Sequence, residues 1–454
     1  MTTRDQPANR GNPTADQLGG DAYPHDLAHV VRARWHAIEA ASIAEAVPLP
    51  EPRVLEHVLS VCYQASLLRE EGRSITFRLA LSGPEAFAVA GGPPASLHRL
   101  LFTRWRPLDE HELRGLAPAA GFQSSLIGAQ LDDDGRAQIW GLIHSGPRWL
   151  QSVRGGREIR QVIPPVLMIA VTGPGRVLVS KGAATIAELS SGILGGPGMD
   201  VLLARWMSDI FAHVRDAQSA AHLAARPQSA TGWAQVDPTF GPLLTQHVLR
   251  RILATIRGAQ HGGTLILLPP HHAADVLTSD RHLSLKYTFR DEEPRRRILT
   301  LTVEIINELA GLHGASTGES AVHWPEYEES SAPQLAALDE ALFEVAHLVA
   351  ALADVDGAVV MTSSLELLGF GGEIAGNLPE VATVARALDL EATQREWVRT
   401  DRVGTRHRSA YRLCQALRDA VAVVISQDGG LRFVRWHDDA VTYWDQVATG
   451  PWEV

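Results

Sequence analysis

The chain has 454 residues, of which 45% are apolar and 20% charged, a composition typical of globular proteins and long enough for about three domains. Its net charge of −11 opposes attraction to polyanions, so neither nucleic acid nor an anionic membrane face is expected as its main partner. Cys62 and Cys414, the two cysteines, fit no metal-binding or disulfide pattern, and we expect both in the core.

The beginning of the chain, residues 1–24, is polar and has no apolar run of the kind found in signal peptides. It is predicted to be a flexible tail. No segment contains the roughly 20 consecutive apolar residues that a membrane-spanning helix needs. These patterns predict a cytoplasmic protein with no membrane partner.

The N-terminal half is predicted to form an α+β domain over residues 25–230. Helical spacing of apolar residues comes first, and alternating runs around Asp-Gly and Gly-Pro-Gly turns then predict antiparallel hairpins. The predicted elements are helices at 26–46 and 52–69, a strand at 74–82, hairpins at 124–146 and 164–182, and a helix at 200–225. Residues 225–241 are rich in Pro, Gly and Ser and are predicted to be a connector.

The second half alternates helical and strand-like patterns, which predicts an α/β or α+β domain over residues 242–447 with a mixed sheet flanked by helices. The predicted order is a helix at 243–259, a buried strand at 263–270, an irregular charged segment at 271–294, a strand then a helix at 295–314, a polar loop at 315–332, and then helix, strand, turn and strand up to 376.

A basic cluster stands at the start of a predicted helix in the C-terminal region. Apolar residues spaced three and four apart from Ala410 predict a helix that begins near Arg408, with Thr405 as its N-cap. A helix N-terminus attracts phosphate, and Arg406 and Arg408 add planar donor groups that suit phosphate oxygens. His407 adds a donor or a metal ligand. The alternative is a solvated basic helix start paired with nearby acids.

A carboxylate is predicted at the mouth of the strand that follows residue 357. Asp356 is followed by Gly357 and Ala358, which are small enough for a flat ligand to lie against the backbone. Mg²⁺ is often held between one or two carboxylates and substrate phosphates. The alternative is an ordinary turn aspartate.

Other polar or glycine-rich segments carry weaker signals. His271 and His272, with Asp275 nearby, are not expected to share a metal, because adjacent side chains of a strand point to opposite faces. Residues 369–376 are rich in glycine and predict a tight loop beside a nucleotide. The tryptophans, including Trp140, Trp149 and Trp206, are predicted to anchor the core or an interface.

Two motifs together resemble the catalytic (DAC) domain of bacterial diadenylate cyclases, which join two ATP molecules into cyclic di-AMP. The first is Asp356-Gly357-Ala358, and the second is Gly404-Thr405-Arg406-His407-Arg408, followed by a helix and by the strand Val424–Gly430. Gly263–Leu267 resembles an earlier strand of the same family. The resemblance covers roughly the last 200 residues, and it implies the DAC fold and nucleotidyltransferase activity.

The resemblance also implies a role for each matched residue. Asp356 would bind Mg²⁺ or Mn²⁺ near the attacking ribose 3′-hydroxyl, and His407 would share that metal. Asp356, Arg406, His407 and Arg408 would be catalytic, and the nucleotide would be bound by Gly357, Ala358, Gly404, Thr405, Ser426 and Gln427. Because each domain holds one ATP, the reaction requires a homodimer or a higher homo-oligomer with facing sites.

The chain departs from the family pattern at two places. Gln427 stands where the family has an acidic residue, so a possible metal or base contact has lost its charge. Asp354-Val355 stands where many members have Leu-His. Two alternatives therefore stay open: a nucleotide-binding sensor whose cyclase fold has lost turnover, and a related nucleotidyltransferase that makes another product.

Residues 25–230 resemble, more weakly, the probable sensor domain of the DACNV type that is fused to some of these cyclases. The resemblance rests on Ile139–Gly146 and on the hairpin at 164–182. It implies a regulatory domain with a small-molecule signal of unknown identity. A dimerisation or spacer domain is the alternative, because no polar cluster in this half converges by its spacing.

Overall fold

A computed structural model describes residues 22–39, 48–87, 97–122, 124–144, 164–182, 184–190, 192–195, 199–225, 233–259, 261–314, 321–427 and 430–446. Most of the predicted tail, Trp149, residues 226–232 of the predicted connector, and Asp428 and Gly429 lie outside these residues. The chain divides into two compact units, with the described residues up to Gly195 in the first and those from Met199 in the second. No helix in the described ranges is both long and apolar enough to cross a membrane.

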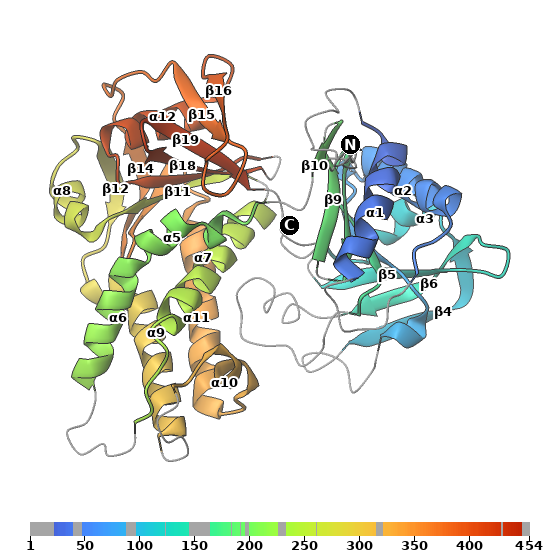
Figure 1. The fold of residues 1–454 in the computed structure, drawn as a ribbon, viewed down its shortest axis with the longest axis horizontal. Helices are drawn as coiled ribbons and strands as arrows, with labels where there is room; N and C mark the ends of the chain where they lie inside the picture. The colour runs from blue at the N-terminus through green and yellow to red at the C-terminus, as the bar shows by residue number, and fades with distance from the viewer. Residues whose placement is uncertain are drawn as a thin grey trace, which may run out of the picture. The chain divides into compact units, whose positions relative to one another are not determined.

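The first unit combines helices with a mainly antiparallel sheet of eight strands in the order β10-β9-β8-β7-β3-β5-β6-β4 (Figure 1). Its helices are α1 (Pro24–Glu39), α2 (Pro52–Leu67) and α3 (Glu110–Leu116). Its strands are β3 (Phe77–Leu81), β4 (His98–Pro107), β5 (Ser125–Leu131), β6 (Ala137–His144), β7 (Leu167–Gly173), β8 (Arg176–Lys181), β9 (Ala184–Ser190) and β10 (Ile193–Gly195), and a small ladder joins β1 (Arg69–Glu70) to β2 (Arg73–Ser74). The predicted hairpins are confirmed as β5–β6 and β7–β8.

The core of the first unit lies between the helices and one face of this sheet. α1 contacts β9, while α2 contacts β7 and β8. Cys62 of α2 is fully buried here, as predicted, and burial raises the pKa of its thiol to about 12. Trp140 is also buried, and its indole N–H donates to the carbonyl of Ser82 at 2.8 Å. The predicted α+β organisation is therefore confirmed.

The second unit is built on a nine-stranded mixed sheet in the order β12-β14-β13-β11-β17-β18-β19-β15-β16. Its strands are β11 (Gly263–Leu268), β12 (Leu283–Thr288), β13 (Ala358–Thr362), β14 (Leu367–Ile374), β15 (Thr383–Ala387), β16 (Arg395–Arg399), β17 (Val421–Ile425), β18 (Leu431–His437) and β19 (Ala440–Gln446). Its helices are α5 (Arg205–Ile210), α6 (Ala212–Ala225), α7 (Phe240–Gly258), α8 (Ala273–Thr278), α9 (Glu292–His313), α10 (Trp324–Glu329), α11 (Pro333–Leu352) and α12 (Thr405–Ala416).

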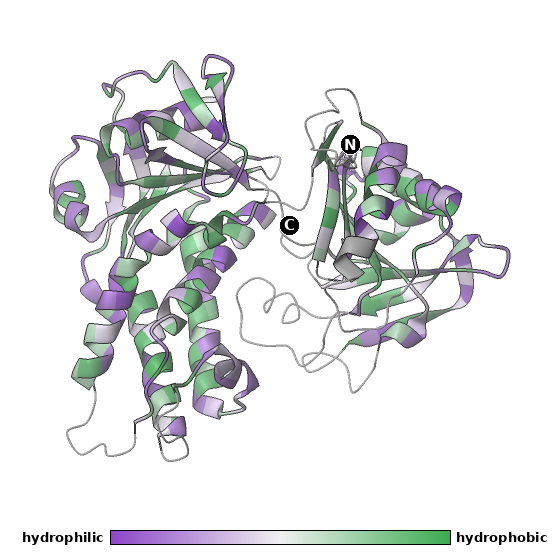
Figure 2. Ribbon diagram, viewed as in Figure 1, coloured by the Kyte–Doolittle hydropathy of each residue, from purple (hydrophilic) through white to green (hydrophobic). Residues whose placement is uncertain are grey.

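Both faces of the central strands are covered. β11 pairs in parallel with β13 and antiparallel with β17, so the predicted mixed sheet flanked by helices is confirmed. Alternate residues of these strands enter two cores, because successive side chains of a strand point to opposite faces. Leu265 and Val423 pack with α7, α9 and α11, whereas Ile266 and Val424 pack with α12. Figure 2 shows hydrophobic residues, in green, along the central strands, and both hydrophobic and polar residues on the helices around them.

Several predicted elements of the second unit were wrong. Residues 292–313 form the single helix α9 instead of a strand and a helix, because Ile298, Leu301, Ile305 and Leu309 recur at helical spacing and are buried together. The segment expected to be irregular contains α8 and β12, and the expected polar loop contains α10 in its described part. The glycine-rich segment from residue 369 lies in β14 up to Ile374, not in a tight loop.

The boundary between the units also differs from the predicted one. Residues 200–225 were placed in the N-terminal domain, yet they pack in the core of the second unit. Trp206 lies against Trp444 of β19, with ring centroids 4.8 Å apart, and α6 packs on α7 and α9. Helical periodicity shows which face of a segment is buried but does not identify its packing partner.

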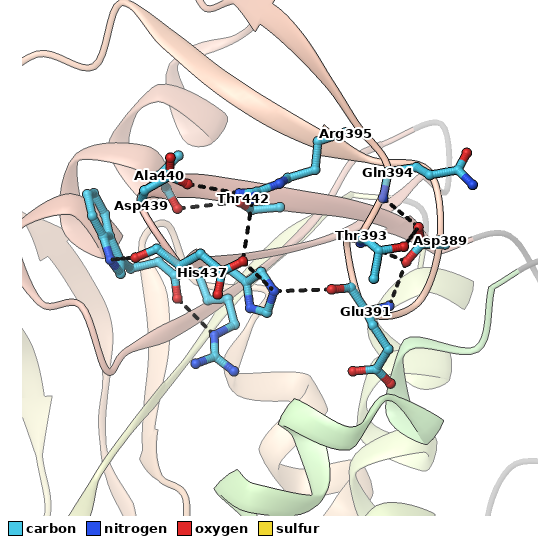
Figure 3. Close-up of polar contacts among 12 residues, drawn as sticks. Asp389, Glu391, Thr393, Gln394, Arg395, His437, Asp439, Ala440 and Thr442 are labelled. Carbon is cyan, nitrogen blue, oxygen red and sulfur yellow. Dashed lines mark hydrogen bonds and ion pairs between the residues drawn. The ribbon is translucent and has the colours of Figure 1, made fainter.

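The loop that joins β15 to β16 is held by one aspartate (Figure 3). Asp389 accepts hydrogen bonds from the backbone of Glu391, Thr393 and Gln394 and from the Thr393 hydroxyl. Although burial opposes the shift, these bonds hold the pKa of Asp389 below its ordinary value. The carbonyl of Glu391 accepts from Nε2 of His437 at 3.1 Å, so the loop is tied to β18.

A partly buried histidine of α7 predicts acid sensitivity. His247 stacks on Trp324 of α10, with ring centroids 4.5 Å apart, and its Nδ1 is buried without a hydrogen-bond partner among the described residues. Burial, with Arg250 and Arg251 nearby, lowers its pKa from 6.5 to about 4, while Asp200 opposes the shift. The pKa of His247 is lower in the folded chain than in the unfolded chain, so the folded chain favours the neutral imidazole. The contribution of His247 to the free energy of unfolding is therefore fully present above pH 6.5 and is lost as the pH falls towards 4.

We expect His247 to account for up to about 3 kcal/mol of destabilisation between pH 7 and pH 4. The measurement is urea unfolding at both pH values for the natural chain and for His247→Phe, which retains an aromatic ring against Trp324. The variant should lose less stability on acidification. Equal losses in the two chains would contradict the assignment.

Candidate functional site

The basic cluster lies at the first turn of α12. The helix begins at Thr405, and Gly404 is its N-cap with φ −63° and ψ 164°. The prediction of Thr405 as the N-cap is therefore wrong, and no side chain caps this end of the helix. The first backbone N–H groups of a helix lack intrahelical partners, so this end favours an anion.

A cavity of about 480 Å³ opens at this helix end. It lies between the start of α12 and the end of β17, and it contains predicted site residues from both of these elements. Its lining residues are Gly404, Thr405, Arg406, His407, Val424, Ile425, Ser426 and Gln427. Tertiary folding therefore joins the two halves of the downstream motif in one concave site.

The two arginines of the basic cluster carry no competing ion pair among the residues that the structure describes. Arg406 and Arg408 are exposed, and neither has a carboxylate partner in the ranges that the structure describes. Asp401, one of the nearby acids that the alternative interpretation requires, pairs instead with Arg399 at 3.0 Å. Arg406 therefore presents an unneutralised cation at the cavity, whereas Arg408 lies outside its lining.

Gly262 is a site residue that sequence reasoning missed. Its φ is +68°, and a Cβ at this position would lie 2.8 Å from Nη1 of Arg406 and 2.8 Å from the carbonyl of Ile425. The guanidinium thus lies directly over this glycine, beside the end of β17. The Gly262-Gly263 pair before the buried strand was the available signal, since adjacent glycines often mark a close approach of two backbones.

The upstream motif occupies the start of β13. Asp356 is exposed, and its carboxylate has no hydrogen-bond or ion-pair partner among the described residues. Gly357 has φ +115°, and a Cβ there would lie 2.6 Å from the carbonyl carbon of Gly371 in β14. Ala358 is buried in the core beneath α12. The backbone of Gly357 therefore lies directly against β14, and the side chain of Ala358 points into the core.

Sheet register brings the two motifs to the same end of the sheet. Thr264 of β11 lies opposite Ala358 on one side and Val424 on the other. These two partners are thus separated by two strand spacings, roughly 10 Å. Beside them, Nε2 of His261 lies 2.7 Å from a carboxylate oxygen of Asp354. The metal-binding carboxylate implied by the resemblance therefore lies near the cavity but does not line it.

A partly buried network of hydrogen bonds attaches α12 to the sheet. Arg432 of β18 donates to the Tyr411 hydroxyl at 2.9 Å and to Asp445 at 2.7 Å, and its guanidinium lies 4.0 Å from the Tyr443 ring centroid. Burial raises the pKa of Tyr411 to about 12, so this hydroxyl stays protonated at neutral pH. Cys414 is buried on the same helix, as predicted. These contacts attach α12, whose first turn lines the cavity, to β18 and β19.

Three comparisons with known proteins add one finding. A family model described as "Probable sensor domain DACNV" matches residues 44–144. This match confirms the N-terminal resemblance over part of the predicted domain. The comparison with curated proteins and the comparison with solved structures find no match.

Proposed function

We propose that this chain is a diadenylate cyclase that condenses two ATP molecules into cyclic di-AMP and two pyrophosphates. The observation that carries the proposal is the cavity in which the uncapped N-terminus of α12 and the unneutralised Arg406 meet Ser426 and Gln427 of the β17 end. An anionic, phosphate-bearing ligand fits such a site. The DACNV match adds support, because that region resembles the sensor domain of such cyclases.

The proposed reaction is an in-line displacement. The 3′-oxygen of one ATP forms a bond to the α-phosphorus of the other, the bond to the bridging oxygen breaks, and pyrophosphate leaves with the electron pair while the hydroxyl proton passes to solvent or base. Thr405, Arg406 and His407 would hold the phosphates and neutralise charge that develops on them. A second copy of the chain must supply the second ATP, so two such sites face each other.

A divalent cation fits the residues that are present. Asp356 has no hydrogen-bond or ion-pair partner in the part of the chain that the structure describes, and the imidazole of His407 is at the cavity wall. Mg²⁺ or Mn²⁺ would be held by Asp356, His407 and substrate phosphates, and it would supply charge neutralisation. As part of the same proposal, the protein is located in the cytoplasm and its first unit binds a small-molecule signal.

The experiment is product analysis of the full chain incubated with ATP and either Mg²⁺ or Mn²⁺. We expect cyclic di-AMP and pyrophosphate from the natural chain, and none above background from Asp356→Asn, since the amide retains the shape of the side chain and removes its charge. A different cyclic or linear product would instead support a related nucleotidyltransferase. Circular dichroism of both chains verifies that they are folded.

One observation favours a second function, that of a nucleotide-binding sensor without turnover. Gln427 lines the cavity with a neutral amide, which is a weak ligand for Mg²⁺. Tight ATP binding with no product under either metal would support this function and would exclude the cyclase. Gln427→Glu is the informative variant, because product formation by it alone would locate the loss of turnover in that amide.

A further inference from the structure

Two histidines and an aspartate meet at the other end of the strands that carry the cavity. His271 and His272 lie on the short turn Pro270–His272 that follows β11, and Asp419 lies in the turn between α12 and β17. These turns are neighbours because Leu267 of β11 pairs with Val421 of β17. The expectation that the two histidines face opposite sides is therefore wrong: they do not lie on a strand.

Both imidazoles converge on one carboxylate. Nε2 of His271 lies 3.2 Å from Oδ2 of Asp419, and Nε2 of His272 lies 3.0 Å from Oδ1. The two ring centroids are 4.2 Å apart, and one ligand atom from each residue lies within 4.8 Å of the others. Two ligand atoms of a tetrahedral zinc ion are about 3.3 Å apart, because each lies about 2.0–2.1 Å from the metal. The two distances from imidazole Nε2 to an Asp419 carboxylate oxygen, 3.2 and 3.0 Å, are therefore close to the separation of two ligand atoms on one zinc ion.

We propose that His271, His272 and Asp419 form a binding site for a divalent transition metal, with Zn²⁺ as the best match. Two imidazoles and one carboxylate favour zinc, nickel, cobalt or copper over Mg²⁺, which prefers oxygen ligands. Three protein ligands leave a position for water. Asp275, the acid nearest in sequence, is not part of this cluster.

The surroundings of the cluster are compatible with a bound cation. Arg418, which precedes Asp419, places its guanidinium 4.0 Å from the ring centroid of Trp436. The neighbouring positive charge is therefore engaged with an aromatic face. The His272 side chain is 20% exposed and the His271 side chain 66%, so an ion reaches the site directly from solvent.

The site is separate from the proposed nucleotide site. β11 has six residues, so its two ends are roughly 20 Å apart. A metal here would link the turn after β11 to the turn after α12. It would thus hold the C-terminal end of the helix whose N-terminus forms the cavity, without contact with the nucleotide. The inference does not depend on the cyclase proposal.

The test uses Co²⁺ as a spectroscopic probe and Zn²⁺ as its competitor, on the full chain carrying Asp356→Ala. That background removes the carboxylate of the other metal site. We expect one Co²⁺ per chain with visible absorption typical of nitrogen and oxygen ligands, displaced by Zn²⁺. Asp419→Asn and His272→Gln should each weaken binding at least about tenfold. His25→Gln should not, because His25 pairs with a single carboxylate, Asp26, at 3.1 Å.

Each outcome decides the proposal. Loss of binding in the two cluster variants, with retention in the His25→Gln control, would establish the site. Absence of Co²⁺ and Zn²⁺ binding to the parent, or equal binding by the parent and Asp419→Asn, would overturn it and leave an ordinary histidine–aspartate contact. Thermal unfolding without metal verifies that every variant is folded, and Zn²⁺ should raise the unfolding temperature of the parent but not that of Asp419→Asn.

Discussion

Arg406→Ala is expected to lower the rate of cyclic di-AMP formation by about 10²- to 10³-fold, the effect of removing one preorganised donor from a transition state. Arg406 lines the cavity, lies over Gly262 and has no carboxylate partner among the described residues, so its charge is available to phosphate. Because its exposed side chain is not part of a core, the variant should fold normally. The measurement is the steady-state rate of product formation at saturating ATP.

Two further variants sharpen this prediction. Arg406→Lys keeps the charge but loses the planar pair of donors, so it should recover only part of the rate. Arg296→Ala removes another exposed arginine, which lies on α9 and pairs with Glu292, and should leave the rate unchanged. If Arg406→Ala and Arg296→Ala had the same rate as the natural chain, Arg406 would have no role in the reaction.

Gly357→Ala is expected to destabilise the second unit by roughly 2–4 kcal/mol, the sum of backbone strain and overpacking. At φ +115° an L-residue is strained, and the added Cβ would lie 2.6 Å from the carbonyl carbon of Gly371. The atoms that the new Cβ would meet belong to the backbone of Gly371 and Gly372 and not to a flexible side chain, so β13 or β14 must move. The measurement is the urea midpoint of unfolding by circular dichroism.

The matched control for this substitution is Gly376→Ala, two residues after β14. A Cβ at Gly376 would meet no atom within 4 Å, and its φ is not in the left-handed region. This variant should be as stable as the natural chain or slightly more stable. If Gly357→Ala had the same urea midpoint of unfolding as Gly376→Ala, packing would not require a glycine at position 357. Product formation should fall in Gly357→Ala, because the displaced strand carries Asp356 at its mouth.

Much of the fold could be predicted from hydrophobic periodicity. The hairpins β5–β6 and β7–β8 follow from alternation around turn residues, and β11 and β13 follow from short apolar runs. α9 was missed at its start because its β-branched residues satisfy a strand pattern over a few positions and a helix pattern only over the full length. Segment length, not local composition, decided between the two structures.

The candidate site was predictable in part. The motif residues Gly404–His407 with Ser426 and Gln427 do line one cavity. Gly262 was missed because its importance lies in what approaches it, the Arg406 guanidinium and the Ile425 carbonyl, and both are distant in sequence. The histidine pair was misjudged for the same reason, since its carboxylate partner, Asp419, lies far along the chain.

The sequence by itself determined the mixed α/β character of the second unit, the hairpins of the first, and the basic cluster at a helix start, because each depends on local spacing and turn chemistry. Only the tertiary structure decided that residues 200–225 pack in the second unit and that Gly357 packs against β14. It also decided that Asp419 is the carboxylate that contacts His271 and His272. These depend on contacts between strands that are adjacent in the sheet but distant in the chain, and local periodicity contains no information about such pairing.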